Sequence, residues 1–177
     1  MTVANTKTVR PHSLSFPIKM VWTAVGMIAV FHLAFGSFSK HFGIMVDTQE
    51  NRCIPEYSVY FIKKNVKAIE KGKIYVFGAL GLEPFFSDST PIGKYAVGIQ
   101  GDLVVQNEQG VFINNQIIAA GFPVADKLGG DETQFYKSYT IQPNQIFFTG
   151  TANRSFDSRY WGTASLEQVK GEAIPLW

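Results

Sequence analysis

Acidic residues are missing from the first 46 positions, and this absence sets the N-terminal part of the chain apart from the rest. The same stretch carries four basic residues: Lys7, Arg10, Lys19 and Lys40. Over all 177 residues the formal net charge is only +2, and no basic run is interleaved with aromatic residues. A charge this small, without such a run, argues against nucleic acid as a partner.

Histidine and cysteine are also scarce. All three histidines precede residue 42, so the remainder of the chain can form neither a histidine metal site nor a Ser-His-Asp triad. We therefore expect no metal and no cofactor. The single cysteine, Cys53, excludes an intramolecular disulfide. A lone thiol is usually a small buried side chain, but Cys53 lies in a polar loop just before Pro55, and such loops often carry nucleophiles. Both interpretations stay open at this point.

Residues 20–38 form an apolar run of 19 residues without a formal charge. This is close to the roughly 20 residues that a bilayer-spanning helix needs. Basic residues precede the run, so the positive-inside rule predicts a cytoplasmic N-terminus at 1–19, a transmembrane anchor at 20–38 and an extracytoplasmic domain at 39–177. A cleaved signal peptide is the main alternative, although no clear Ala-X-Ala site closes the run. Membrane lipid is therefore an expected partner.

After the apolar run, short segments rich in β-branched and aromatic residues alternate with turns. They cover residues 58–62, 73–77, 95–99, 103–105, 110–114 and 145–150. This spacing favours an all-β domain over alternating strands and helices. Residues 115–146 carry weaker signals, and residues 164–171 indicate a turn of helix before a short apolar end. We therefore predict one mainly β domain after one N-terminal transmembrane helix.

Lys94 interrupts an otherwise apolar segment that ends at Gly101 and Asp102. Burial disfavours the charged form of a lysine, and a neutral lysine amine can act as a general base. The alternative is a strand whose lysine extends its amine to water. Two further segments favour the interpretation of Lys94 as a general base. They are Asn-Arg-Cys-Ile-Pro at 51–55 and Asn-Arg-Ser-Phe-Asp-Ser-Arg-Tyr-Trp-Gly at 153–162.

In chain order, the anchor, the cysteine loop, Lys-X-Ala-Val-Gly-X-X-Gly-Asp and Asp-Ser-Arg-Tyr-Trp-Gly resemble the bacterial type I signal peptidases, or leader peptidases. The last motif is the most specific. The small size, and a proline two residues after the candidate nucleophile, resemble the conjugative-transfer, TraF-type branch of that family. The resemblance covers about residues 47–177 and implies a signal-peptidase-like β catalytic domain with a small, variable inserted β region at 115–146.

The resemblance also implies a role for each matching residue, in a serine-lysine dyad that uses no histidine. Lys94 matches the general base, and Ser155 matches a serine that orients it. Asp157 and Arg159 match a structural ion pair that holds the motif in shape.

The nucleophile is where this chain departs from the family, because Cys53 stands where the family has serine. A thiol has a reference pKa of about 8.5, much closer to neutrality than a hydroxyl, so a cysteine-lysine pair is chemically competent. There are two alternatives: the site has lost its activity, or Ser58 is the nucleophile. The backbone N–H of Cys53 and the side chain of Asn51 are candidate donors to an oxyanion.

The function implied is that of an endopeptidase anchored in the bacterial cytoplasmic (inner) membrane and active on its periplasmic side. It would remove the leader of an exported precursor after small residues. In the conjugative branch the precursor is a pilin, and its own amine can replace water to give a cyclic product. The alternative is a non-catalytic assembly factor of a conjugation or secretion apparatus that retains the fold.

Overall fold

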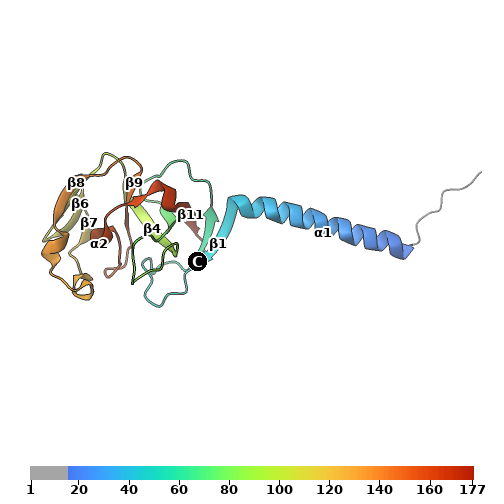
Figure 1. The fold of residues 1–177 in the computed structure, drawn as a ribbon, viewed down its shortest axis with the longest axis horizontal. Coiled ribbons are helices and arrows are strands. Elements are labelled where there is room, and N and C mark those ends of the chain that lie inside the picture. Colours follow the sequence, from blue (N-terminus) through green and yellow to red (C-terminus); the bar gives the residue numbers. More distant parts are fainter. Residues whose placement is uncertain (1–15) are drawn as a thin grey trace, which may run out of the picture. The chain divides into compact units, whose positions relative to one another are not determined.

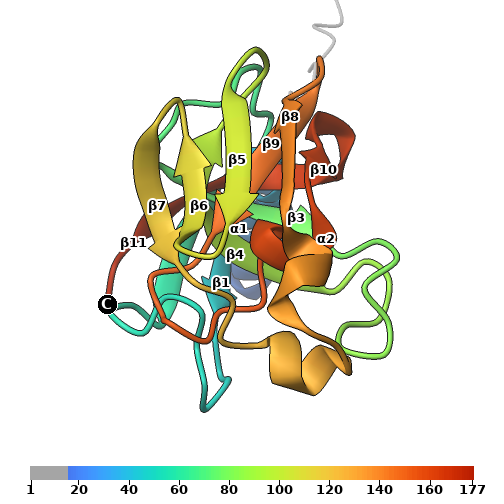
Figure 2. The same cartoon turned by 90° about the vertical axis from the view of Figure 1, so that its left-hand side faces the viewer.

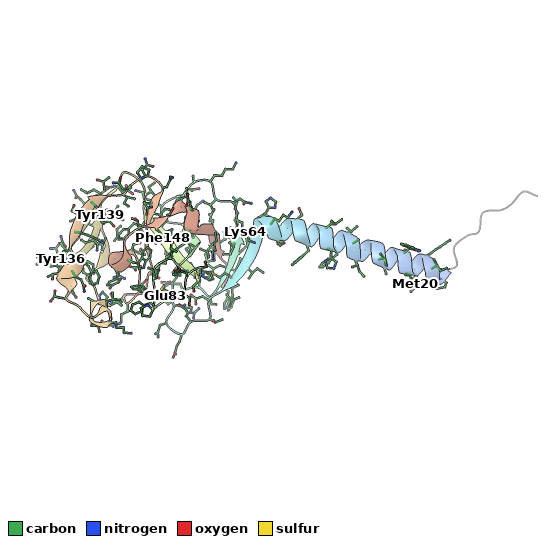
Figure 3. The ribbon with its side chains drawn as sticks, viewed as in Figure 1. Met20, Lys64, Glu83, Tyr136, Tyr139 and Phe148 are labelled. Atoms are coloured by element: carbon green, nitrogen blue, oxygen red, sulfur yellow. The ribbon has the colours of Figure 1, made fainter. Side chains whose placement is uncertain are left out.

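The computed structural model describes residues 16–177, which fall into two units divided between Lys40 and His41 (Figure 1). The first unit contains helix α1 (Phe16–His41) except for its last residue, and Met20 lies near the start of the helix (Figure 3). None of its residues is buried, and its mean hydropathy reaches 1.7 over 18 residues, so α1 is long and apolar enough to cross a membrane. The helix extends beyond the expected 20–38 at both ends. Of the expected cytoplasmic segment 1–19, residues 1–15 lie outside the described residues.

The second unit is built on a seven-stranded antiparallel sheet with the order β1-β2-β11-β3-β4-β9-β10. Its strands are β1 (Phe42–Val46), β2 (Val59–Lys63), β3 (Ile74–Gly78), β4 (Pro91–Gly98), β9 (Gln145–Thr149), β10 (Ala164–Ser165) and β11 (Val169–Pro175). The prediction of a helical turn at 164–171 is wrong for most of that segment. Only the 3-10 turn η3 (Leu166–Gln168) is helical, and the chain then enters β11, which pairs with β2 on one side and β3 on the other.

A second, four-stranded sheet has the order β7-β6-β5-β8 (Figure 2). Its strands are β5 (Leu103–Asn107), β6 (Gly110–Ile113), β7 (Gln116–Ala120) and β8 (Lys137–Thr140), with the 3-10 turns η1 (Ala125–Leu128) and η2 (Glu132–Phe135) between the last two. This sheet begins before the expected inserted region, since it includes the predicted hairpin β5–β6. The mainly β fold predicted from the sequence is confirmed.

Strand β9 holds the two sheets together because its neighbouring side chains point to opposite faces. Phe147 packs in the cluster shared with the small sheet, and Phe148 packs in the cluster of the large sheet. The ring centroids of Phe148 and Phe77 lie 4.4 Å apart. Strand β9 and its neighbour β4 therefore have a fixed position between two buried aromatic clusters.

The turn from β4 into β5 is fixed by the carboxylate of Asp102. It accepts hydrogen bonds from the Ile99 N–H (2.9 Å) and the Asn114 side-chain amide (2.7 Å), and it pairs with Lys71 (3.1 Å). Burial acts to raise the pKa of Asp102, but these three partners outweigh it and lower the pKa below its ordinary value. The Gly-Asp turn recognised in the sequence is thus the point where the chain passes between the sheets.

Candidate functional site

Lys94 lies in the middle of β4, on the face that carries its buried side chains. It is 0 % exposed, and its Nζ donates a hydrogen bond to Ser155 Oγ at 2.9 Å. No ion pair formed by residues 16–177 includes Lys94. Burying a charged group without an ionic partner is costly, which makes this fully buried lysine unusual among the polar side chains of the domain.

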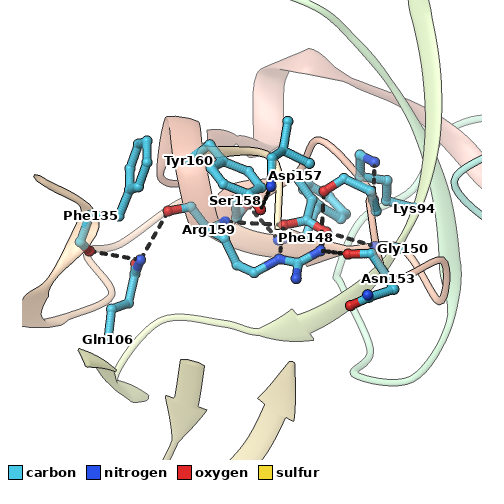
Figure 4. Close-up of polar contacts among 12 residues, drawn as sticks. Lys94, Gln106, Phe135, Phe148, Gly150, Asn153, Asp157, Ser158, Arg159 and Tyr160 are labelled. Atoms are coloured by element: carbon cyan, nitrogen blue, oxygen red, sulfur yellow. Dashed lines mark hydrogen bonds and ion pairs between the residues drawn. The ribbon is translucent and has the colours of Figure 1, made fainter. Parts of the chain in front are cut away.

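Ser155 is held in place by the buried guanidinium of Arg159, which also contacts Asn153 and Asp157 (Figure 4). Arg159 Nη2 donates to the carbonyl oxygens of Ser155 (3.1 Å) and Asn153 (3.3 Å). Its Nε and Nη2 also donate to the two carboxylate oxygens of Asp157, at 2.8 and 2.9 Å. The two expected contacts, Ser155 with Lys94 and Asp157 with Arg159, are therefore present.

The buried carboxylate of Asp157 stabilises the charged form of Arg159. Burial acts to lower the pKa of Arg159, but the hydrogen bonds and charge of Asp157 outweigh it, so the pKa is raised. The Asp157 carboxylate also accepts from the N–H of Arg159 at the start of the short helix α2 (Ser158–Trp161) and from the N–H of Gly150. One carboxylate therefore connects the end of β9 to α2, and the Ser155 loop between them is fixed at both ends.

Gln106 takes part in this arrangement although the sequence gave no reason to select it. Its side-chain amide donates to the carbonyl oxygens of Arg159 (2.9 Å) and Phe135 (3.0 Å), as Figure 4 shows. Gln106 belongs to β5, so the small sheet supports the ion-pair loop directly. A single glutamine in a predicted hairpin carries no signal of such a contact.

Gly150 brings the cysteine loop against Ser155. A methyl group at Gly150 would overlap both the Cys53 carbonyl oxygen and Ser155 Oγ, so only glycine allows this approach. The Cys53 carbonyl also accepts from the Ala152 N–H at 3.1 Å. The sequence showed a strand ending in this glycine but gave it no role in the site.

Cys53 itself is partly buried in the loop between β1 and β2. The direct hydrogen bond expected between Cys53 Sγ and Lys94 Nζ is absent from the contacts of the described residues. Asn51 is exposed in the same loop. Ser58, the alternative nucleophile, donates its hydroxyl to the Trp177 carbonyl (3.3 Å), so it is bonded to the C-terminal segment. Both candidate nucleophiles belong to the loop between β1 and β2, but Cys53 is the one whose own backbone carbonyl contacts the segment from Gly150 to Ala152.

A hollow of about 130 Å³ opens at Cys53. Its walls come from the end of β1 and the loop after it, from the start of β4 and from one aromatic side chain: Met45, Val46, Asp47, Thr48, Gln49, Phe86, Pro91, Ile92 and Gly93. Cys53 therefore stands at the wall of a hollow formed between β1 and β4. Within residues 16–177 no group of histidine, cysteine and carboxylate side chains could hold a metal ion.

The chain was compared with known protein families and structures. A family model described as "Signal peptidase, peptidase S26" matches residues 17–177. A crystal structure of a signal peptidase I from Enterococcus faecalis V583 is similar at 19% sequence identity, with a TM-score of 0.38, over 61% of this chain and 98% of that chain. No curated protein matches the sequence.

Proposed function

The chain belongs to the signal peptidase family, peptidase S26, and on that premise we propose that it removes leader peptides with Cys53 as nucleophile and Lys94 as general base. The family consists of serine-type hydrolases that cleave the leader peptides of precursor proteins. The observation that carries the proposal is the fully buried Lys94 amine, which is hydrogen-bonded to Ser155 and lacks an ionic partner among the described residues. A non-catalytic binding module has no need of such a lysine.

The proposed reaction begins when Lys94 takes the thiol proton of Cys53 and the sulfur attacks the scissile carbonyl carbon. The resulting oxyanion is stabilised by the backbone N–H of Cys53, with Asn51 as a second candidate donor. The C–N bond then breaks, the Lys94 ammonium gives its proton to the leaving amine, and the leader remains on Cys53 as a thioester. Water attacks the thioester, Lys94 accepts its proton, and the free leader acid and the thiol are restored.

Ser155 acts in this scheme as a positioning residue. Its hydroxyl lies 2.9 Å from Lys94 Nζ, and its carbonyl is held by Arg159, so it fixes the direction of the lysine side chain. Because the resting structure has no direct hydrogen bond between Cys53 and Lys94, the thiol reaches the amine by a rotation of its side chain about χ1 or through a bridging water.

The precursor is proposed to be a conjugative pilin, and the features that support this are the short chain and the Pro55 that follows Cys53 by two residues. A cyclic product requires that the pilin itself, and not a leader, is the acyl group on Cys53. The C–N bond to a C-terminal segment of the pilin then breaks, that segment leaves with the proton from Lys94, and the pilin's own N-terminal amine attacks the thioester in place of water and restores the thiol. The mass of the product distinguishes the two outcomes, because the cyclic form lacks one water.

Processing of the precursor in cells tests the proposal. Cys53→Ala and Lys94→Ala should accumulate uncleaved precursor, while Lys67→Ala, at an exposed lysine, should process it as the wild type does. Cys53→Ser should retain some processing, because it restores the usual nucleophile of the family. Full processing by Cys53→Ala would exclude Cys53 as the nucleophile. Unchanged processing in both alanine variants would favour the non-catalytic assembly factor.

A further inference from the structure

A second, larger hollow of about 570 Å³ lies on the other side of the Lys94 position. Two consecutive runs line it, residues 117–120 of β7 and residues 149–153 after β9, and Tyr95, Val97 and Arg159 complete the wall. Successive side chains of a strand point to opposite faces, so four consecutive lining residues place the backbone of β7 itself along the hollow. The volume is within the usual range of about 300–1,000 Å³ for ligand sites.

The two hollows meet strand β4 on either side of Lys94, and Cys53 lines the first of them. Gly93 lines the first hollow and Tyr95 lines the second, and Lys94 stands between them on β4. Gly150 lines the second hollow and packs against the Cys53 carbonyl and Ser155 Oγ. A peptide cleaved at Cys53 must extend away from the scissile bond in both directions, so each hollow is placed to receive one side of it.

The edges of the two sheets support the same conclusion. Proteins usually protect an open strand edge with a charge, a proline or a very short strand. The edge strand β8 contains Lys137, and the edge strand β10 has only two residues. The edge strands β1 and β7 contain neither charge nor proline, and these two strands line the first and the second hollow respectively. An unprotected edge is a template for pairing with an extended peptide.

The direction of the substrate follows from chain connectivity. Met45, in the first hollow, follows the last residue of α1 by four residues, which span at most about 14 Å. If α1 crosses the membrane, the first hollow is tethered close to the bilayer, where the apolar leader of a precursor resides. The leader side of the substrate then occupies the first hollow, and the segment after the scissile bond, the mature segment, occupies the second.

We propose that the open edge of β7 binds the first residues of the mature segment as an added antiparallel or parallel strand, so that this edge is a second substrate-binding site. The inference rests on the proposed peptidase function. The lining offers apolar and small side chains, including Ile117, which is 54% exposed. Its one charged residue, Arg159, is 2% exposed and paired with Asp157, so the site takes an uncharged, extended segment.

Two synthetic peptides, cleaved by the full chain in detergent micelles, test this site. Both end their leader part in Ala-X-Ala. The long peptide continues for five alternating valine and threonine residues, the length of β7, and the short peptide ends after one residue as an amide. For the wild type, kcat/KM should be about tenfold higher for the long peptide, the effect of one or two net backbone hydrogen bonds. N-methylation of alternate amides in the five residues should remove this advantage.

Ile117→Lys and Ala120→Lys place a charge on the β7 edge at exposed positions, and each should lower the long-to-short ratio to about 1. Ser138→Lys places the same charge on β8, the opposite edge of the small sheet, and should keep the wild-type ratio. A wild-type ratio of about 1, or a ratio that neither β7 variant changes, would overturn the β7 site while leaving the peptidase function intact. Failure of the wild type to cleave either peptide would overturn the peptidase function and the inference together.

Discussion

At the scale of single residues, the site depends on a buried ion pair more than on the dyad's own contacts. Asp157 and Arg159 are 0% and 2% exposed, and together they bind the ends of the loop that presents Ser155 to Lys94. An ion pair so deeply buried gains little over a well-packed apolar pair, but removing one partner leaves an uncompensated charge. Its contribution is therefore the fixed geometry of the loop.

Asp157→Asn should destabilise the folded domain by about 3–5 kcal/mol, because the guanidinium of Arg159 then lacks a counter-charge in the interior. Urea unfolding followed by tryptophan fluorescence measures the free energy of unfolding. The matched control is Asp126→Asn, which breaks the exposed pair of Asp126 with Arg154 and should leave the unfolding curve unchanged. Equal stability of Asp157→Asn and the wild type would show that the ion pair is dispensable for folding.

Gly150→Ala should lower the rate of leader cleavage by about a hundredfold, because its methyl group would displace the Cys53 carbonyl or Ser155 Oγ. The measurement is kcat/KM for a leader peptide. Gly43→Ala is the control, since the added methyl there lies 3.5 Å from Lys64 Cε, an ordinary contact distance. Wild-type activity in Gly150→Ala would show that the approach of these two loops has no role in catalysis.

The residues that the sequence identified and those that it missed differ in how their contacts arise. Lys94, Ser155 and the ion pair belong to motifs whose spacing the family resemblance made recognisable. Gly150 and Gln106 act through close approach and through one amide placed between two loops. Such contacts depend on the packing of segments that are distant in the sequence, so the local sequence pattern does not predict them.

At the scale of the elements, local pattern found six of the eleven strands in the described residues, and it missed β1, β7, β8, β10 and β11. The strands β2, β3 and β9 alternate or are rich in aromatic residues, and the sequence placed each within one or two residues. Strand β11 contains Gly171 and ends at Pro175, which are weak strand signals. It forms because β2 and β3 offer it hydrogen-bonding partners on both sides, a condition set by the whole sheet.

The turn between the sheets should make folding stability depend on pH through Asp102. Its pKa is lowered in the folded state, so its stabilising contribution is fully present above the unfolded pKa of about 3.9 and is lost as pH falls through the folded value. Asp102→Asn should therefore be less stable than the wild type near neutrality, and the difference should shrink below about pH 4. Lys71→Met, which removes one of the partners, should show a smaller difference of the same sign. Urea unfolding at a series of pH values measures both, and a difference that does not change with pH would contradict the assigned role of the carboxylate.

At the scale of the whole molecule, the sequence predicted an apolar N-terminal helix followed by a mainly β domain, and both are present. The division of that domain into two sheets was harder to predict from the sequence. The small sheet closes when β8 pairs with β5, more than thirty residues earlier in the chain, and such a pairing is decided by tertiary contacts. The boundary expected at residue 115 therefore falls inside the sheet.

The acid-free N-terminus predicts the orientation of the chain in the membrane, with the β domain on the outer side. Alkaline phosphatase fused after Trp177 should be active, because it folds only outside the cytoplasm. A β-galactosidase fusion at the same site should be inactive. The opposite pair of results would place the candidate site in the cytoplasm and contradict its proposed role in processing exported precursors.

The decisive measurement is the detection of a covalent intermediate on Cys53. A leader peptide is mixed with the full chain, the reaction is quenched with acid within the first turnover, and the intact mass of the protein is measured. We expect an adduct with the mass of the leader acyl group, located on Cys53 and released by neutral hydroxylamine as a thioester. We expect no adduct for Cys53→Ala or Lys94→Ala. An adduct on a serine of the wild type, or an adduct that persists in Cys53→Ala, would exclude Cys53 as the nucleophile.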